Sequence, residues 1–160
     1  MSHIRRSNII QLFFGLILLM CPKEILAKDT LARLLETGYC SFCDLRNIQI
    51  GSIADNEMDP HPMDLTETYL VHANFSQADL TKVIFARSYL NGARFVGADL
   101  SGADFTGSEL ELADFSGANL TNTIFSKAYL LHARLSIEQL RAVKLCQTTL
   151  PDASISHRDC

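Results

Sequence analysis

Large apolar residues recur at every fifth position from Leu65 to Leu150, and the phase of this pattern does not slip. Leu45 and Ile50 hold the same phase further upstream. Five residues advance an α-helix by about 500°, so successive large residues would not share one side of a helix. Five is also an odd number, so on a flat strand these residues would alternate between the two faces. The chain must therefore bend once in each unit to keep its large residues on one side.

The other positions of each unit supply what such a bend needs. A small residue often stands two positions before the large one, a polar residue directly before it, and Ser, Thr or Gly after it, as in ADFTG at 103–107. Polar residues and Gly are typical of turns. A chain that bends regularly with its apolar side inward coils on itself, and stacked coils form a solenoid.

The tandem motif A-[DN]-[LF]-x-x resembles the signature of pentapeptide-repeat proteins over roughly residues 43–155. The resemblance implies an all-β solenoid, namely a right-handed quadrilateral β-helix with four units and 20 residues in each coil and with short helical caps. Residues 53–62 interrupt the motif without changing its phase. We interpret them as a solvated loop and not as a metal site, because the spacing of their acidic residues matches no calcium-loop pattern.

Both ends of the predicted solenoid carry helix signals. Leu31, Leu34 and Leu35 form one apolar side within 28–42, which predicts an N-terminal helical cap. Ser136 and Gln139 have the spacing of a capping box, which predicts a short helical turn over 136–142. Residues 156–160 then form a C-terminal tail.

Phe and Leu alternate as the large residue from Phe75 to Leu130. In a coil of four units, this alternation places Phe on two opposite faces and Leu on the other two. A core filled in this way has one ring facing another in every coil. We therefore predict two facing stacks of rings, Phe75 with Phe95 and Phe115, and Phe85 with Phe105 and Phe125.

The residue directly before each large one is expected to face solvent. On two adjacent faces, and at the turn beside them, these outward positions hold aromatic and aliphatic side chains. The candidate partner-surface residues are Tyr69, Ile84, Tyr89, Leu112, Ile124, Tyr129 and Leu131. Large exposed apolar patches usually mark partner surfaces, whereas scattered apolar residues are common on any surface. Both interpretations stay open at this point.

The remaining two faces are charged. One alternates in sign along its length and is expected to join neighbouring coils by weak ion pairs. It carries Asn74, Arg94, Asp114 and Arg134. The other holds an acidic column that ends after two members, with Asp79, Asp99, Asn119 and Gln139.

Residues 1–27 have the order of a secretory signal peptide. Arg5 and Arg6 precede an apolar run from Ile9 to Met20, and the small residue Ala27 follows. A membrane-spanning helix needs about 20 residues, and this apolar run is shorter. We expect a periplasmic or secreted protein with no stable membrane span after cleavage. An uncleaved N-terminal segment that anchors the protein in the membrane is the alternative.

Four cysteines follow residue 27, namely Cys40, Cys43, Cys146 and Cys160, and in a secreted chain they predict disulfides. At a coil spacing of about 4.8 Å, Cys43 and Cys146 would lie on the order of 25 Å apart. A disulfide needs Cα atoms within about 7 Å, which favours the pairs Cys40–Cys43 and Cys146–Cys160. Buried free thiols are the alternative. The same distance disfavours a zinc site formed by all four, and no βαβ context supports a redox centre.

No catalytic arrangement is present in the sequence. The five His residues form no close-spaced ligand set, and no phosphate loop, nucleophile elbow or HExxH motif occurs. The net charge of -4 and the lack of a basic patch argue against a nucleic-acid partner. We expect a non-enzymatic protein without metal or cofactor, an exported scaffold or binding module whose surface meets a protein partner or a second copy.

The alternative function comes from the resemblance. Some pentapeptide-repeat proteins imitate DNA and inhibit type II topoisomerases by means of an acidic column. The predicted export and the basic residues Arg94 and Arg134 weigh against this alternative.

Overall fold

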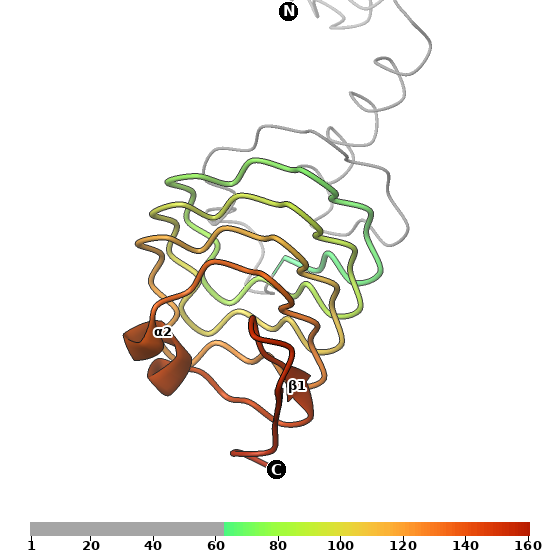
Figure 1. Ribbon diagram of the computed structural model, residues 1–160. Coiled ribbons are helices and arrows are strands. Elements are labelled where there is room, and N and C mark those ends of the chain that lie inside the picture. Colours follow the sequence, from blue (N-terminus) through green and yellow to red (C-terminus); the bar gives the residue numbers. More distant parts are fainter. Residues whose placement is uncertain (1–62) are drawn as a thin grey trace, which may run out of the picture.

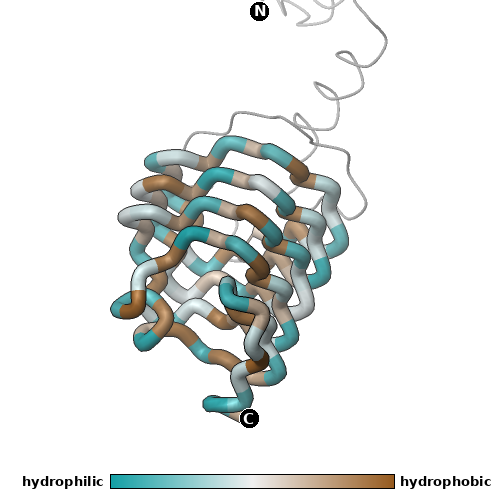
Figure 2. Tube along the Cα trace, viewed as in Figure 1, coloured by the Kyte–Doolittle hydropathy of each residue, from teal (hydrophilic) through white to brown (hydrophobic). Residues whose placement is uncertain are grey.

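The computed structural model describes residues 63–160, which wind into stacked coils (Figure 1). Residues twenty positions apart form parallel β-bridges, such as Tyr69 with Tyr89 and Asp79 with Asp99, so a coil of twenty residues is confirmed. Hydrophobic positions recur at matching points of successive coils (Figure 2). The predicted leader, the helical cap at 28–42 and the loop at 53–62 lie outside the described residues.

The bend in each unit is a turn with a left-handed residue. In one such turn the backbone N–H of Ala73 donates to the carbonyl of Leu70 at 3.0 Å, and His72 has a φ of 58°. Gly92, one coil later, has a φ of 66°. Gly adopts this conformation readily, whereas other residues lose roughly 1–2 kcal/mol in it. The bend is therefore present in each unit from Glu67 to His132, including those in which the sequence has no Gly to mark it.

Bridges of one residue, and not long strands, connect most of the coils, because the turns occupy the rest of each unit. In the described part, the longer elements all lie near the C-terminal end. They are α2 (Ile137–Ala142), β1 (Thr148–Thr149) and β2 (Ile155–Ser156), and β2 pairs antiparallel with β1.

Helix α2 begins where the capping-box spacing predicts it. The Ser136 hydroxyl accepts from the backbone N–H of Gln139 at 3.1 Å, and the Gln139 side chain accepts from the N–H of Ser136 at 2.8 Å. The Gln139 amide also donates to the carbonyls of Phe115 and Ala118, both at 2.8 Å. The prediction that Gln139 lies in a column of outward residues was therefore wrong. Helix α2 replaces a regular unit at this point, and the Gln139 side chain bonds to the backbone edge of the preceding coil instead.

The core contains the two predicted stacks of rings, together with buried Leu and Ala side chains. All six Phe side chains are fully buried. Within a stack, ring centroids lie 4.9–5.1 Å apart with nearly parallel planes. Across the coil, the rings meet edge to face at 5.6–5.9 Å. Each aromatic pair adds about 0.5–1.5 kcal/mol beyond the burial of its area, so the stacks hold successive coils in one register.

The chain leaves the repeat earlier than residue 155, where the sequence analysis placed its end. The last parallel bridge joins Tyr129 and Thr149, and the chain then turns back so that Ile155 pairs antiparallel with Thr149. Ile155 keeps the phase of the large apolar residues, yet it is 61% exposed because of this reversal.

Two consecutive side chains close the edge of the last coil. The carboxylate of Asp159 accepts from the N–H of Leu145 at 2.7 Å, and the N–H of Asp159 donates to the carbonyl of Leu145 at 2.9 Å. The Arg158 guanidinium donates to the carbonyls of Leu140 and Val143. These groups take the place of the backbone of a further coil.

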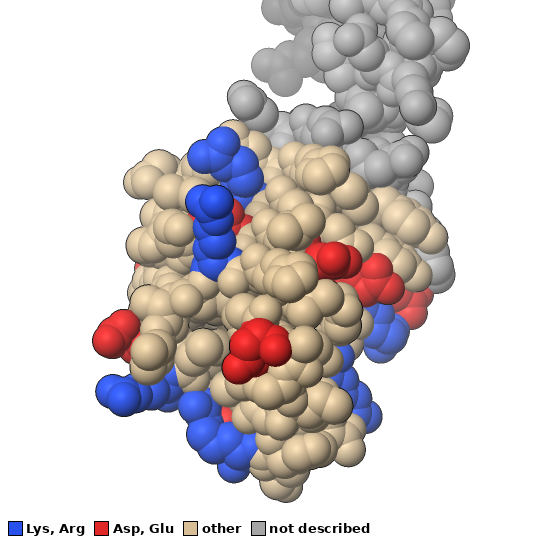
Figure 3. All heavy atoms as spheres, viewed as in Figure 1, with Lys and Arg blue, Asp and Glu red and all other residues tan. Residues whose placement is uncertain are grey.

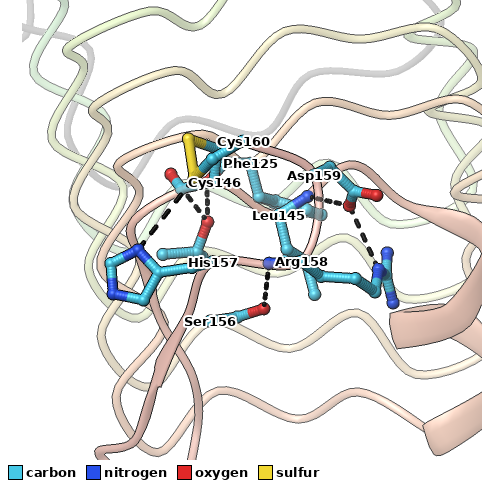
Figure 4. The surroundings of a disulfide bond; sticks show 9 residues. Phe125, Leu145, Cys146, Ser156, His157, Arg158, Asp159 and Cys160 are labelled. Atoms are coloured by element: carbon cyan, nitrogen blue, oxygen red, sulfur yellow. Dashed lines mark hydrogen bonds and ion pairs between the residues drawn. A yellow bond between two sulfur atoms is a disulfide. The ribbon is translucent and has the colours of Figure 1, made fainter.

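A disulfide between Cys146 and Cys160 fixes this segment to the last coil (Figure 4), with Cα atoms 4.8 Å apart. The prediction for this pair is confirmed. The pair Cys40–Cys43 lies outside the described residues.

The buried rings generate the first testable prediction. Phe105→Ala leaves a cavity between two coils and should lower the free energy of unfolding by about 3–5 kcal/mol in urea denaturation. Ile137→Ala is the control, because that side chain is 66% exposed on α2 and should change stability by less than about 0.5 kcal/mol. Equal midpoints for the two variants would contradict the packing described above.

The edge of the last coil generates a second prediction. The hydrogen bond from the Leu145 N–H, together with the Arg158 guanidinium, holds the pKa of Asp159 below its ordinary value of 3.8. A lowered pKa in the folded state adds stability that is complete above the unfolded pKa and is lost as the pH falls through the folded one.

Asp159→Asn should therefore lower the Tm by a constant amount between about pH 5 and pH 7, and this difference should shrink below about pH 4. Thermal denaturation followed by circular dichroism measures it. A difference that is the same at pH 2 and pH 7 would show that the charge of Asp159 does not stabilise the edge.

Candidate partner surface

One face of the solenoid carries a column of tyrosines, which we call the tyrosine face. Parallel bridges link its members in the order Tyr69, Tyr89, Glu109, Tyr129 and Thr149. The rings of Tyr69 and Tyr89 are stacked, with centroids 4.7 Å apart and planes within 3° of parallel. Tyr69 is 41% and Tyr129 39% exposed. The face thus offers aromatic side chains to solvent in a fixed order.

Hydrogen bonds between coils fix the backbone beneath this column. The N–H of Glu109 donates to the carbonyl of Ser88 at 3.0 Å, and the N–H of Leu90 donates to the carbonyl of Glu109 at 2.8 Å. On the next coil, the N–H of Tyr129 donates to the carbonyl of Ser108 at 2.9 Å. Beneath the face, Ser88 and Ser108 are buried and their hydroxyls bond to backbone carbonyls. The spacing of the outward side chains is therefore set by the core.

Glu109 is the one charged member of the column. Its carboxylate accepts from the side-chain amide of Asn91 at 3.1 Å, and the carbonyl oxygen of that amide accepts from the N–H of Glu111 at 2.9 Å. Asn91 therefore positions Glu109. Asn91 was not among the predicted site residues, although the period of twenty places it one coil before Glu111.

Glu109 makes no ion pair among the described residues. Within 63–160, three acidic side chains lie within 4.0 Å of a basic one, and Glu109 is not among them. The three pairs are Arg87–Glu67, Arg134–Asp114 and Arg158–Asp159. The Glu109 side chain is exposed.

The turn beside the tyrosine face adds apolar and imidazole groups. Leu112 is 62% exposed and has a φ of 59°, at a position that other units give to Gly. His72 lies against Gly92, where an added Cβ would be 2.4 Å from the imidazole Nδ1. Gly92 thus leaves room for a flat ring at this corner, and His132 occupies the equivalent turn near the other end.

The structure sorts the predicted surface residues into two groups. Tyr69, Leu112 and Tyr129 are exposed, whereas Tyr89 and Leu131 are half-buried. Ile84 and Ile124 are also half-buried and lie on the adjacent face, where they alternate with Asp64 and Asp104.

Ile155 extends the tyrosine face and was not predicted. It pairs directly with Thr149, and side chains that oppose each other in a strand pair lie on the same side. Its phase pointed inward, so the sequence held no signal for its exposure.

The face with alternating charge forms fewer ion pairs than expected. Arg134 Nη1 lies 3.9 Å from Asp114 Oδ2, whereas Arg94 acts on Asp114 only at longer range. The hydrogen bond from the Ser116 hydroxyl, aided by both arginines, lowers the pKa of Asp114. The prediction that ion pairs join neighbouring coils on this face is therefore confirmed for Arg134 with Asp114, whereas Arg94 forms no such pair within residues 63–160.

The acidic column is used within the fold. Asp79 accepts from the N–H and hydroxyl of Thr81, at 3.1 and 2.6 Å. Hydrogen bonds from Ser101 and Asn119 lower the pKa of Asp99. These carboxylates hold turns in place. On the side of the molecule seen in Figure 3, acidic and basic groups are interspersed across a mostly uncharged surface.

A hollow of about 510 Å³ lies beside α2 and has one cationic side chain, Arg134, whose guanidinium already faces Asp114. Residues 63–160 contain no group of three or more His, Cys, Asp or Glu side chains placed to hold a metal ion. In the same part of the chain, no helix is both long enough and apolar enough to cross a membrane.

Residues 64–97, 84–122 and 98–136 match the protein family described as pentapeptide repeats, with 8 copies. The match spans residues 64–136, and it agrees with the coil of twenty residues and with the stacked rings of the structure.

A solved structure has a similar fold. The chain is similar to HetL, a pentapeptide-repeat protein involved in heterocyst differentiation regulation from the cyanobacterium Nostoc sp. strain PCC 7120, with 30% identity and a TM-score of 0.58. This alignment covers 72% of the present chain and 50% of HetL, so the chain spans half the length of that structure.

Two further structures are similar at a lower level. Rfr23, from the cyanobacterium Cyanothece 51142, shares 24% identity over 80% of this chain and 97% of its own, with a TM-score of 0.43. QnrB1, a plasmid-mediated fluoroquinolone resistance protein, shares 26% identity over 69% of this chain and 51% of its own, with a TM-score of 0.39. Scores this low support no argument about function. No curated protein sequence matches the chain.

Proposed function

We propose that this protein is a non-enzymatic, exported scaffold that binds a protein partner through its tyrosine face. The scaffold in this proposal is the right-handed quadrilateral β-helix that the resemblance implies. The observation that carries the proposal is the exposed aromatic column, with Tyr69 and Tyr89 stacked at 4.7 Å and Tyr129 two coils beyond Tyr89.

Tyrosine is well suited to such a surface. Its ring adds a large contact area with few rotatable bonds, and residues that dominate binding energy are enriched in Tyr. Because Tyr69 and Tyr89 already hold each other in place, little conformational freedom is lost when a partner packs on them. Exposed Leu112 beside the column and exposed Ile155 near its end supply apolar contacts around the rings.

Mimicry of DNA toward a topoisomerase has less support. The acidic column holds the carboxylates of Asp79 and Asp99, which are engaged in their own turns, and continues with the neutral Asn119. Arg94 and Arg134 are exposed on the neighbouring face and would repel a site that binds DNA.

Export is part of the proposal and rests on residues 1–27. It implies a mature chain that begins at Lys28 and is recovered outside the cytoplasm. A full-length cytoplasmic protein would instead favour the topoisomerase alternative.

A third prediction tests the surface itself. Tyr89→Asp places a charge in the middle of the aromatic column and should abolish capture of the partner in a crosslinking pull-down with the mature protein. The captured protein is then purified and its binding measured directly, where the loss should be at least about 100-fold, as for a central aromatic contact.

Asn122→Asp is the matched control, because it adds the same charge at an exposed turn outside the tyrosine face, in a left-handed conformation that Asp also adopts. It should bind as the wild type does. Partner binding that survives Tyr89→Asp, or is lost equally in both variants, would show that the tyrosine face is not the binding surface.

A further inference from the structure

The tyrosine face contains an electrostatic mismatch within the molecule. Parallel bridges place Glu109 between Tyr89 and Tyr129, one coil from each. Since the Tyr69 ring covers one face of the Tyr89 ring, the other face of Tyr89 is directed toward the level of Glu109. The face of an aromatic ring carries partial negative charge. A carboxylate at this level therefore adds to the negative charge of its surroundings instead of compensating it.

No cation of the described chain compensates this charge. Glu109 has no ion pair within 63–160, and its carboxylate accepts a hydrogen bond from the neutral amide of Asn91. That amide orients the carboxylate from the side and leaves the side chain exposed to solvent. Hydrogen bonds of 2.8–3.0 Å to both neighbouring coils prevent the backbone from moving Glu109 away from the rings.

The spacing admits a planar group. Tyr89 and Tyr129 lie two coils apart, which is about 10 Å at the usual spacing of paired strands. A flat cationic group at the intermediate level would lie about 5 Å from each ring, which is within the range of about 6 Å for a cation–π contact. The surroundings are apolar on one side, where Leu112 is exposed and Leu131 half-buried.

We infer that Glu109, between Tyr89 and Tyr129, is a recognition site for an arginine side chain presented by the protein partner. The inference rests on the proposed function and names the chemistry of its central contact. Guanidinium is planar, stacks on aromatic rings and forms paired hydrogen bonds with a carboxylate, whereas the ammonium of lysine is a strongly hydrated point charge. Charge complementarity with Glu109 and cation–π contact with the rings act on the same group.

The test uses the full mature chain and a defined probe, the peptide acetyl-Leu-Arg-Leu-amide. Its neutral counterpart has citrulline in place of arginine and keeps the shape of the side chain. Nuclear magnetic resonance of tyrosine-labelled protein follows the ring signals. We expect the arginine peptide to shift the signals of Tyr89 and Tyr129 more than that of Tyr69, and the citrulline peptide to bind at least about tenfold more weakly.

Glu109→Gln should reduce binding of the arginine peptide to the level of the citrulline peptide. Glu111→Gln is the matched control, because it removes the same charge two residues away at the turn and should keep most of the binding. An unchanged Tm in both variants excludes a loss of folding. Equal binding of the two peptides, or full binding by Glu109→Gln, would overturn the inference.

The outcomes also separate this inference from the proposed function. If partner binding depends on Tyr89 but not on Glu109, the tyrosine face remains the binding surface and the arginine site is refuted. If the wild type forms a dimer in sedimentation that Glu109→Gln abolishes, the occupant is a second copy, and the assignment to a separate partner is overturned.

Discussion

The left-handed residue in the turn of each unit is the constraint on which the rest of the structure depends. It bends the chain by a similar amount every five residues, so that twenty residues return it to the same face. Only with that coil length do Phe75, Phe95 and Phe115 fall into one stack. The stacks keep the coils in register, which in turn arranges the outward side chains in columns. The energy that ordinary residues lose in this conformation is offset by the burial that it makes possible.

A scaffold of this kind separates folding from recognition. The inward positions repeat with little variation, whereas the outward ones differ from face to face and carry the specific chemistry. The carboxylates of Asp79 and Asp99 accept hydrogen bonds within their own turns, so they stabilise the fold. The tyrosine face departs from this use of polar residues, because its rings are exposed and Glu109 has no cationic partner in the described chain. The departures from the repeat, and not the repeat, define the candidate site.

The sequence predicted the features that depend on period alone. The phase of five placed both stacks of Phe, and the capping-box spacing placed α2. Features at the end of the repeat were missed, because there the chain leaves its period and its contacts are set by three-dimensional proximity. The side chains of Arg158 and Asp159 bond to backbone groups of the last coil that a further coil would otherwise bond. Ile155 is exposed because the chain reverses direction there, and no local sequence pattern predicts this reversal. The column of Tyr69, Tyr89 and Tyr129 was predictable from the period. The period also places Asn91 one coil before Glu111, but it does not give the hydrogen bond by which the Asn91 amide orients Glu109.

The central claim is that the backbone beneath the tyrosine face is rigid and that recognition is performed by side chains held in advance. Hydrogen exchange of the amide of Glu109, compared with that of Lys144 near the C-terminal edge, tests this claim most directly. Both amides donate to the preceding coil, at 3.0 and 2.9 Å. The account predicts that Glu109 exchanges only when the whole repeat unfolds, and no faster than Lys144. Exchange of Glu109 through a local opening, faster than that of Lys144, would contradict it.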